Sequence, residues 1–304
     1  MFGFTRQAYY QLQRYEYKFK AQSQIVLEMI KNERSSLPGI GGRKLLSLIG
    51  DEMKRQSIHM GRDSFFDLLR ENDLLVRHHK TRIITTNSRH RYRKYPNLIK
   101  DLPLLCAHQV WVSDITYVTT GEGYLYLSLI TDAYSRKIIG WNISNKLEAD
   151  GAVSALEMAL SQLPADKRDS VIHHSDRGIQ YCCDKYISKL RSFNISISMT
   201  ENSDPLENAI AERVNGILKT EWLNRSVITT KYETALKISE IIEAYNIKRP
   251  HLSINMMTPA VAHDSEGNLP RKWKNYWKEN QNKIMYEKKI KMPTLDIEGQ
   301  FSKP

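Results

Sequence analysis

The sequence predicts an α/β protein in which helices cover both sides of a mixed sheet and a basic helical region precedes the sheet. After residue 105 the apolar residues change from a helical repeat to β-branched and aromatic runs, which then alternate with helical segments. The chain of 304 residues has a net charge of +11, and nearly all of this excess lies in residues 1–105. We therefore expect a basic arm over residues 1–105, a core over 106–263 and a basic, aromatic tail over 264–304.

Charge and composition narrow the class of protein. A basic excess confined to one region indicates a polyanionic partner, and nucleic acid fits better than a membrane because the chain has no basic amphipathic helix with an aromatic face. No stretch approaches the ~20 apolar residues of a membrane helix, and the N-terminus does not resemble a signal peptide, so we expect a cytoplasmic protein. Cys106, Cys182 and Cys183 lack CxxC spacing, which predicts reduced thiols and no zinc site.

The arm is predicted to hold three helices. Its first thirty residues have a helical pattern, with tyrosines among arginines and lysines. The breaker sequence SSLPGIGG separates them from an apolar repeat over residues 45–53, and Gly61 marks a turn before a third helix that Asp63 or Ser64 would cap. This order is compatible with a helix-turn-helix, although any small helical bundle has the same pattern of helices separated by turns.

The segment from Arg77 to Lys100 is rich in lysine and arginine and has no acidic residue. A charge run of this kind is usually a solvated linker. It would also neutralise phosphates along a DNA backbone, which adds salt-sensitive affinity without base specificity. Both interpretations can hold at once, because a linker that crosses DNA is still a linker.

The core begins with a predicted three-stranded meander. The strands are QVWVSDITYV (109–118), GYLYLSLIT (123–131) and KIIGWNI (137–143), all rich in β-branched and aromatic residues. A helical repeat over 148–163 follows, then a strand SVIHH, a helix near 183–192 and a strand ISISM. Three strands followed by alternating helices and strands predict a mixed sheet covered on both sides.

Two aspartates stand out in this predicted sheet. Asp114 lies inside a strand, where aspartate is depleted and costs stability unless something binds it, although such a residue is more often satisfied by backbone or hydroxyl donors than by a metal. Asp176 follows the end of an apolar strand, where α/β sheets gather their ligand sites, although turn-forming aspartates are also common there.

A third acid lies on the predicted helix ENAIAERVNGILK, residues 207–219. Its apolar residues share one face, and a row opposite them holds Asn208, Glu212, Asn215 and Lys219, which on a surface helix would usually face water. Asp204 is expected to cap this helix, with Pro205 at its first position and Glu207 in a capping box. Glu212 would then lie two turns inside the helix with no structural role.

Asp114, Asp176 and Glu212 together suggest a divalent-metal site. Mg²⁺ takes oxygen ligands and keeps several waters, so a few carboxylates suffice, and two ions ~3.5–4 Å apart can activate the attacking oxygen and stabilise the leaving oxygen in phosphoryl transfer. Three close acids also need the cations, because like charges would otherwise raise one another's pKa. His173 and His174 are poor ligands for so hard an ion, and we expect them to pack within a strand.

These motifs carry a family resemblance. WVSDITYV, HHSDRGIQY and ENAIAERVNGILKTE, with 35 residues between Asp176 and Glu212, resemble the D, D-35-E signature of bacterial insertion-sequence transposases related to retroviral integrases. YNIKRPHLSINMMTPAVAH, residues 245–263, is similar to that family's closing segment. The three motifs in this order and spacing are specific, whereas any one alone would be weak.

The resemblance implies a ribonuclease-H-like core in which Asp114, Asp176 and Glu212 are catalytic and bind two Mg²⁺ ions, for which Mn²⁺ could substitute. It implies cleavage at transposon ends and then attack of the freed 3′-hydroxyl on target DNA. Lys219 would contact the transposon end. The expected partners are double-stranded DNA, further copies of the chain on that DNA and the helix-turn-helix product of an upstream reading frame. The protein would be nucleoid-associated in a bacterial cytoplasm.

Further DNA contacts are expected from basic residues of the arm and of the closing segment. These are Arg43, Lys44, Arg89, Arg91, Arg93 and Arg249. Two alternatives to a transposase remain: a non-catalytic DNA-binding regulator or inhibitor of transposition, and a nuclease of the same fold that hydrolyses ends without joining them.

Overall fold

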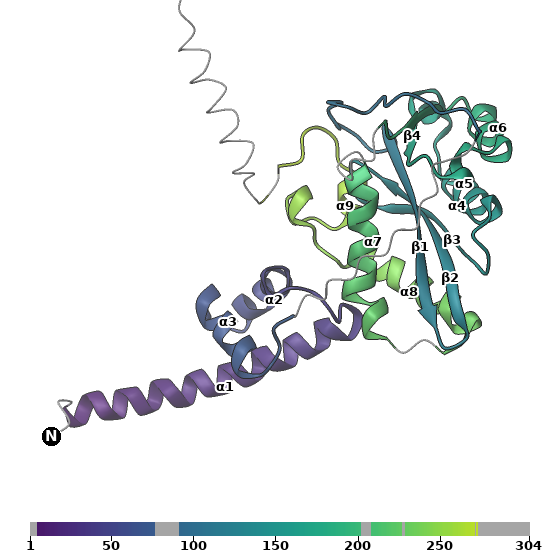
Figure 1. Ribbon diagram of the computed structural model, residues 1–304. Helices are drawn as coiled ribbons and strands as arrows, with labels where there is room; N and C mark the ends of the chain where they lie inside the picture. The colour runs from purple at the N-terminus through teal and green to yellow at the C-terminus, as the bar shows by residue number, and fades with distance from the viewer. Residues whose placement is uncertain (1–4, 77–90, 202–207, 227–228, 271, 273–304) are drawn as a thin grey trace, which may run out of the picture.

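The computed structural model describes residues 5–76, 91–201, 208–226, 229–270 and 272 (Figure 1). Within this part of the chain, three N-terminal helices precede a sheet that is flanked by the remaining helices. Arg89, Asp204, Pro205 and Glu207, and nearly all of the predicted tail, lie outside the described residues. No helix in the described ranges is long and apolar enough to cross a bilayer.

The arm contains the three expected helices, α1 (Arg6–Ser36), α2 (Gly42–Arg55) and α3 (Arg62–Glu71). Their apolar repeats pack together: Val26 and Ile30 of α1 are buried with residues of α2 and α3 in one cluster. The predicted cap of the third helix is wrong. That helix begins at Arg62 with Gly61 as its N-cap, so Asp63 falls in its first turn instead of capping it.

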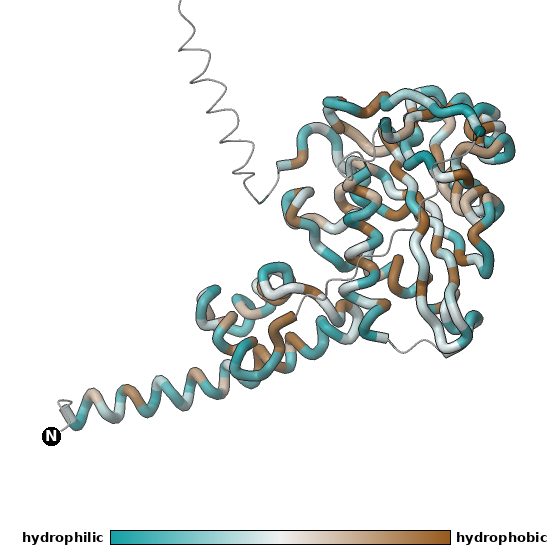
Figure 2. Tube along the Cα trace, in the orientation of Figure 1, coloured by the Kyte–Doolittle hydropathy of each residue, from teal (hydrophilic) through white to brown (hydrophobic). Residues whose placement is uncertain are grey.

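The N-terminal half of α1 projects away from the rest of the molecule (Figure 1), and its tyrosines are exposed. Figure 2 shows that hydrophobic segments concentrate where α1 meets α2 and α3 and within the sheet layer. The arm is therefore a small helical unit with one long helix extending into solvent.

The sheet has five strands in the order β3-β2-β1-β4-β5. β1 (Val110–Thr120), β2 (Gly123–Asp132) and β3 (Ile138–Ser144) form the predicted antiparallel meander, and β4 (Ile172–Ser175) and β5 (Ser196–Met199) continue the sheet parallel to β1. This mixed sheet flanked by helices confirms the predicted α/β fold class.

Two helical layers cover the sheet. Trp111, Ile130 and Ile139 pack with the helices α4 (Ala149–Ser161) and α6 (Asp184–Ser192) on one face. On the other face, Leu127 and Leu129 join a cluster with α7 (Ala209–Glu221) and α8 (Lys231–Ile247). The remaining helices given for the described residues are short: α5 (Ile179–Cys182), α9 (Pro259–His263) and the 3₁₀ turns at Ala165–Ser170, Leu223–Arg225 and Leu252–Ile254.

The arm and the core share one apolar cluster. Leu37 and Ile40, between α1 and α2, belong to the same buried cluster as Leu218 and Trp222 at the end of α7. The Trp222 indole N–H also donates a hydrogen bond to the Ser36 carbonyl oxygen, at 2.9 Å. The arm is therefore packed directly against the helix that carries Glu212.

Candidate active site

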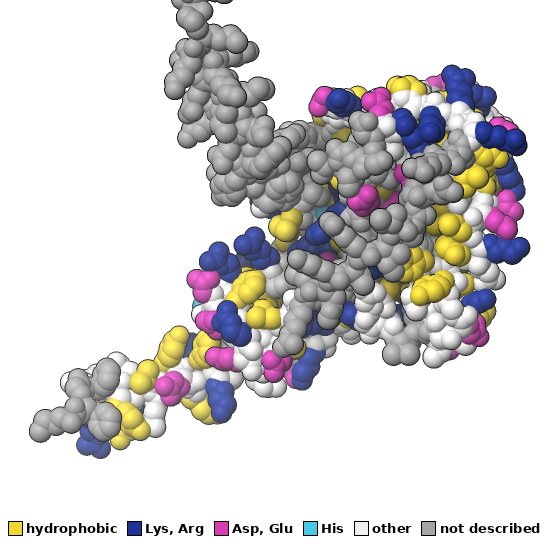
Figure 3. All heavy atoms as spheres, in the orientation of Figure 1, with side chains coloured by type: hydrophobic (Ala, Val, Ile, Leu, Met, Phe, Trp, Pro, Cys, Tyr) yellow, Lys and Arg dark blue, Asp and Glu magenta, His cyan; other side chains and the backbone are white. Residues whose placement is uncertain are grey.

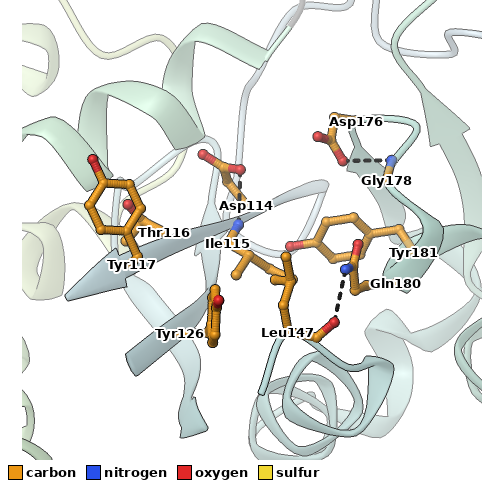
Figure 4. A pocket seen from close by; sticks show the side chains of 10 residues that line it. All are labelled: Asp114, Ile115, Thr116, Tyr117, Tyr126, Leu147, Asp176, Gly178, Gln180 and Tyr181. Carbon is orange, nitrogen blue, oxygen red and sulfur yellow. Dashed lines mark hydrogen bonds between the residues drawn. The ribbon is translucent and has the colours of Figure 1, made fainter. Parts of the chain in front are cut away.

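The two aspartates lie side by side where the pairing of β1 with β4 ends. These parallel strands pair from Val110 with Ile172 to Ser113 with Ser175. Asp114 directly follows the last paired residue of β1, and Asp176 directly follows that of β4. Neighbouring strands lie ~4.8 Å apart, so this register brings the two residues together. Both line one pocket at the edge of β1 that β4 leaves open (Figure 4).

Asp114 has two hydrogen-bond partners. The Asn215 side-chain amide of α7 donates to its Oδ2 at 2.7 Å, and the Ile115 backbone N–H donates to its Oδ1 at 2.9 Å. The pKa of Asp114 is nevertheless raised to about 7, mainly by burial, then by the charge of Asp176 and least by that of Glu212, while the two hydrogen bonds oppose the rise. A bound cation would favour the charged form of this carboxyl group.

Asp176 is held by the turn that follows β4. Its Oδ1 accepts a hydrogen bond from the Gly178 backbone N–H at 3.0 Å, as Figure 4 shows. A Cβ on Gly178 would lie only 2.9 Å from that oxygen, so the turn needs glycine for the carboxylate to lie this close. The turn-forming role and the pocket position coexist in this residue.

Glu212 does not occupy the position expected from the sequence. α7 begins at Ala209 with Asn208 as its N-cap, so the prediction that Asp204 caps this helix is wrong. Glu212 therefore lies in the first turn and not two turns inside, where an acid is favoured by the helix dipole. Its side chain is exposed, and its pKa is raised by partial burial and by the charge of Asp176.

The polar row of α7 faces β1 and not water. Asn208 and Asn215 are buried: the Asn208 amide donates to the Ser113 carbonyl oxygen at 3.1 Å, and the Asn215 amide binds Asp114. The Lys219 ammonium nitrogen lies 3.9 Å from the centroid of the Tyr117 ring. The solvent-exposed interpretation of this row is therefore wrong for these three residues and correct for Glu212.

The donor set fits hard divalent cations. Asp114 and Asp176 offer carboxylate oxygens, and the Asn215 Oδ1 is buried with no hydrogen-bond partner among the described residues. In the described ranges, no three acidic, histidine or cysteine side chains come close enough to share a metal ion. Glu212 is outside the pocket lining, which is consistent with repulsion among three carboxylates that have no cation between them.

The two strand histidines pack inside the sheet layer, as expected. The His173 Nε2 lies 2.6 Å from the Ser113 hydroxyl oxygen and 2.9 Å from the Tyr186 hydroxyl oxygen, and the His174 Nδ1 lies 2.8 Å from the Ser198 hydroxyl oxygen. Burial and, to a smaller extent, the neighbouring His174 lower the pKa of His173 to about 3. His173 is therefore neutral at physiological pH. Cys106, Cys182 and Cys183 are all free cysteines.

Two of the basic residues expected to bind DNA are buried in an ion-pair network instead. Arg249 is 1% exposed, and its Nη2 and Nε donate to the Glu221 carboxylate at 2.6 and 2.7 Å. The Lys44 ammonium lies 3.5 Å from the same carboxylate, and burial and the charge of Arg249 lower its pKa to about 8. The DNA-contact prediction is therefore wrong for Arg249, and Lys44 is largely withdrawn from the surface.

The other arm residues are placed differently. Arg43, Arg91 and Arg93 are exposed, and the Arg93 guanidinium lies 5.2 Å from the centroid of the Tyr95 ring. Sequence reasoning did not identify the aromatic part of the pocket, which comprises Tyr117, Tyr126 and Tyr181. The one available signal was the position of Tyr117, three residues after Asp114 in the same motif.

Comparisons with known proteins support the family resemblance that these motifs indicate. A family described as "Integrase core domain" matches residues 105–205, and a second family with the same description matches residues 193–259. The chain is 33% identical to the insertion element IS600 uncharacterized 31 kDa protein of Shigella sonnei, over 86% of this chain and 95% of that protein. It is 32% identical to the transposase for insertion sequence element IS904 of Lactococcus lactis, over 60% of this chain and 75% of that protein.

Solved structures with a similar chain trace include viral integrases. The catalytic core domain of HTLV-2 integrase in complex with magnesium has a TM-score of 0.40 at 17% identity, over 52% of this chain and 98% of that one. A simian T-cell lymphotropic virus intasome in complex with a PP2A regulatory subunit has a TM-score of 0.46 at 18% identity, over 78% of this chain and 75% of that one.

Proposed function

The chain belongs to the family of bacterial insertion-sequence transposases with an integrase core domain, and from this premise we propose that it cuts DNA at transposon ends and joins them to a target. In this proposal Asp114, Asp176 and Glu212 are the catalytic carboxylates. The observation that carries it is the register of β1 and β4, which brings Asp114 and Asp176, 62 positions apart in the sequence, to one pocket.

Asp114 and Asp176 would hold Mg²⁺, or Mn²⁺ in its place, and Glu212 would complete the ligand set from the first turn of α7. When bound, a pair of such ions supplies activation of the attacking oxygen and charge stabilisation of the leaving oxygen. Asn215 fixes the orientation of the Asp114 carboxylate through its 2.7 Å hydrogen bond. Cation binding would relieve the repulsion that keeps Glu212 outside the pocket, and a small movement at the start of α7 would then bring it in.

The proposed chemistry has two steps at phosphorus. Water attacks the phosphodiester at the transposon end, the bond from phosphorus to the 3′-oxygen breaks, and that oxygen leaves as a 3′-hydroxyl. The freed 3′-hydroxyl then attacks a target phosphodiester, forms a new bond to phosphorus and displaces the target 3′-oxygen. Each step forms one P–O bond, breaks another and moves one proton from the attacking to the leaving oxygen, so no covalent protein–DNA intermediate is needed.

DNA would approach across the exposed basic residues Arg43, Arg91 and Arg93 and reach the pocket beside Lys219. Figure 3 shows Lys and Arg side chains on the exposed surface of both the arm and the core. Joining two ends in one event needs more than one active site, so we propose that further copies of the chain assemble on the DNA. The upstream-frame product with a helix-turn-helix is a second proposed partner.

The test is joining of a labelled duplex that carries the element's terminal repeat to target DNA, with and without Mg²⁺. We expect joined product from the wild type and a loss of at least 100-fold in Asp114→Asn, Asp176→Asn and Glu212→Gln. Glu243→Gln, which removes an exposed acid of α8, is the matched control and should join normally. Equal product from Glu212→Gln and the wild type would refute its assignment.

The same assay separates the alternatives. Tight end binding without product under any metal condition would identify a regulator. Hydrolysed ends without joined strands would identify a nuclease.

A further inference from the structure

A single aromatic ring connects Lys219 to the pocket. β4 pairs with β1 only as far as Ser113, so the edge of β1 beyond Asp114 is open toward the pocket. Lys219 reaches this edge from α7, and its ammonium nitrogen lies 3.9 Å from the centroid of the Tyr117 ring. Tyr117 also lines the pocket together with Asp114 and Asp176 (Figure 4). The ring is therefore in contact with the ammonium group and with the pocket at once.

The Tyr117 ring is itself fixed by the sheet. Tyr124 of β2 packs edge-to-face against it, with centroids 5.7 Å apart and an interplanar angle of 87°. In the β1–β2 register Tyr117 is opposite Tyr126, so Tyr124 is its diagonal neighbour across the pair. A ring held by two strands offers a fixed face to a cation, whereas a lysine side chain alone has four rotatable bonds.

Lys219 has no acidic partner in the part of the chain that the structure describes, unlike the nearby cations Lys44 and Arg249. Among the described residues, no carboxylate lies within ion-pair distance of its ammonium group, whereas Glu221, two residues further along α7, pairs with both Lys44 and Arg249. Lys219 is half-buried, and this burial lowers its pKa, while the charge of Asp114 opposes the shift. A desolvated ammonium held against a ring retains the capacity to bind an anion.

We propose that Tyr117 is a positioning residue for Lys219, holding its ammonium group by a cation–π contact at the mouth of the pocket so that it binds a DNA phosphate. This inference rests on the proposed function, because the phosphate belongs to the DNA that lies against the carboxylates. The ring acts through Lys219 and takes no part in bond making.

The strength of this contact sets the expected effect. Cation–π contacts range from about 0.5 kcal/mol at exposed sites to about 2 kcal/mol when desolvated, which corresponds to about 2- to 30-fold in an equilibrium constant. Lys219 is half-buried, so we expect an effect in the middle of this range. The phosphate contact itself appears in the salt dependence of binding, where each neutralised phosphate contributes about 0.9 to the slope of log K against log salt.

The experiment measures binding of the full chain to the terminal-repeat duplex by fluorescence anisotropy at several salt concentrations. Lys219→Gln should lower the slope by about 1. Tyr117→Leu should weaken binding about 3- to 10-fold and lower the slope in the same way, and the double variant should be no weaker than Lys219→Gln alone. Tyr117→Phe, which keeps the ring, should behave as the wild type. Tyr232→Leu, at an exposed tyrosine of α8, is the matched control and should also leave binding unchanged.

A series of phenylalanine derivatives at position 117 tests the cation–π contact without changing the shape of the side chain. Phenylalanine, 4-fluorophenylalanine and 3,4,5-trifluorophenylalanine fill nearly the same volume but carry a progressively weaker negative charge on the ring face, so affinity should fall in that order. This series remains informative if Tyr117→Leu does not fold.

Three outcomes would overturn the proposal: equal affinity across the fluorinated series, additive losses in the double variant, or wild-type binding by Lys219→Gln. The strand-joining assay distinguishes this failure from failure of the proposed function. If the wild type joins strands but DNA affinity is the same for all residue 117 variants, only the positioning role of Tyr117 is refuted. A wild type that never joins strands, but shows the fluorination trend in DNA binding, refutes the catalytic proposal and retains the role of Tyr117.

Discussion

At the scale of single residues, the site depends on amide groups as much as on acids. Asn208, the N-cap of α7, and Asn215 within it donate hydrogen bonds to the Ser113 carbonyl oxygen and to Asp114, so they hold the helix against the strand at the pocket. The acids alone, with the pKa of Asp114 raised to about 7, would repel one another. The amides therefore orient a carboxylate that its neighbours destabilise.

Asn215→Ala tests this role. Loss of the hydrogen bond to Asp114 frees that carboxylate to rotate, and outer-shell partners of metal ligands typically contribute 10- to 100-fold in metal affinity. We expect strand joining to need about 10- to 100-fold more Mg²⁺ for half-maximal rate. Titrating Mg²⁺ in the joining assay measures this, with Asn32→Ala at an exposed position of α1 as control. An unchanged Mg²⁺ requirement would remove Asn215 from the site.

At the scale of elements, α7 joins the site to the rest of the fold. Its first turn carries Glu212, its middle binds β1, and its last residue, Glu221, accepts from Arg249 and lies near Lys44. Burial alone would raise the pKa of Glu221, but hydrogen bonds and charge from Arg249, together with the charge of Lys44, hold it below its usual range. The end of the helix is therefore tied to α2 and to the closing segment by one buried network.

Arg249→Met should destabilise the protein strongly. It leaves the Glu221 carboxylate buried with only the more distant Lys44, and breaking a buried ion pair from one side costs about 3–5 kcal/mol. Urea unfolding followed by circular dichroism measures this loss. Glu221→Gln combined with Arg249→Met should be milder than Arg249→Met alone, because no unpaired charge remains. A stable Arg249→Met variant with weakened DNA binding would restore Arg249 as a DNA contact.

Alanine substitutions at two glycines test how the elements pack. A Cβ on Gly140 of β3 would lie 2.2 Å from the Ala155 carbonyl oxygen of α4, so Gly140→Ala must push the helix off the sheet and should lower stability by about 1–3 kcal/mol. Gly216 of α7 has no atom within 4 Å of such a Cβ, so Gly216→Ala should instead raise stability by about 0.5–1 kcal/mol. Urea midpoints of both variants measure the difference, and equal shifts would contradict the packing seen here.

The sequence predicts which helices and strands form better than it predicts where they end and which residues contact one another across the fold. The strands follow from local periodicity, whereas the expectation that Asp114 and Asp176 lie together rests on the family resemblance of their motifs, because β2, β3 and α4 separate β1 from β4 in the sequence. The predicted start of α7 is wrong: Asp204 and Pro205 have good capping chemistry, yet the helix begins at Ala209. The pairing of Lys44 with Glu221 joins residues 177 positions apart, and no local pattern carries such a contact.

At the scale of the whole molecule, buried neutral histidines make the fold sensitive to acid. Burial lowers the pKa of His173 to about 3, that of His263 to about 4 and that of His251 well below its usual value. Below about pH 6.5 the unfolded chain takes up a proton at each of them and the folded chain does not. Stability is therefore unaffected by these groups above pH 6.5 and falls as the pH drops from there toward 4.

We expect each of these histidines to cost about 1–2 kcal/mol of unfolding free energy between pH 7 and pH 5. Urea titrations across this range measure the slope. His173→Gln should flatten it, whereas His59→Gln, at an exposed position of the arm, should leave it unchanged. A slope that His173→Gln does not alter would mean that other groups govern acid unfolding.

The apolar cluster shared by Leu37, Ile40, Leu218 and Trp222 constrains how such proteins diversify. An N-terminal arm can be exchanged freely between relatives only if its contact with the core is polar and small. Here the contact is part of the hydrophobic interior, so a chimera that imports a foreign arm must import matching residues of α7 as well. We therefore expect the arm and the core to be inherited as a unit, with the proposed DNA specificity changing by substitution on the exposed helices and not by domain exchange.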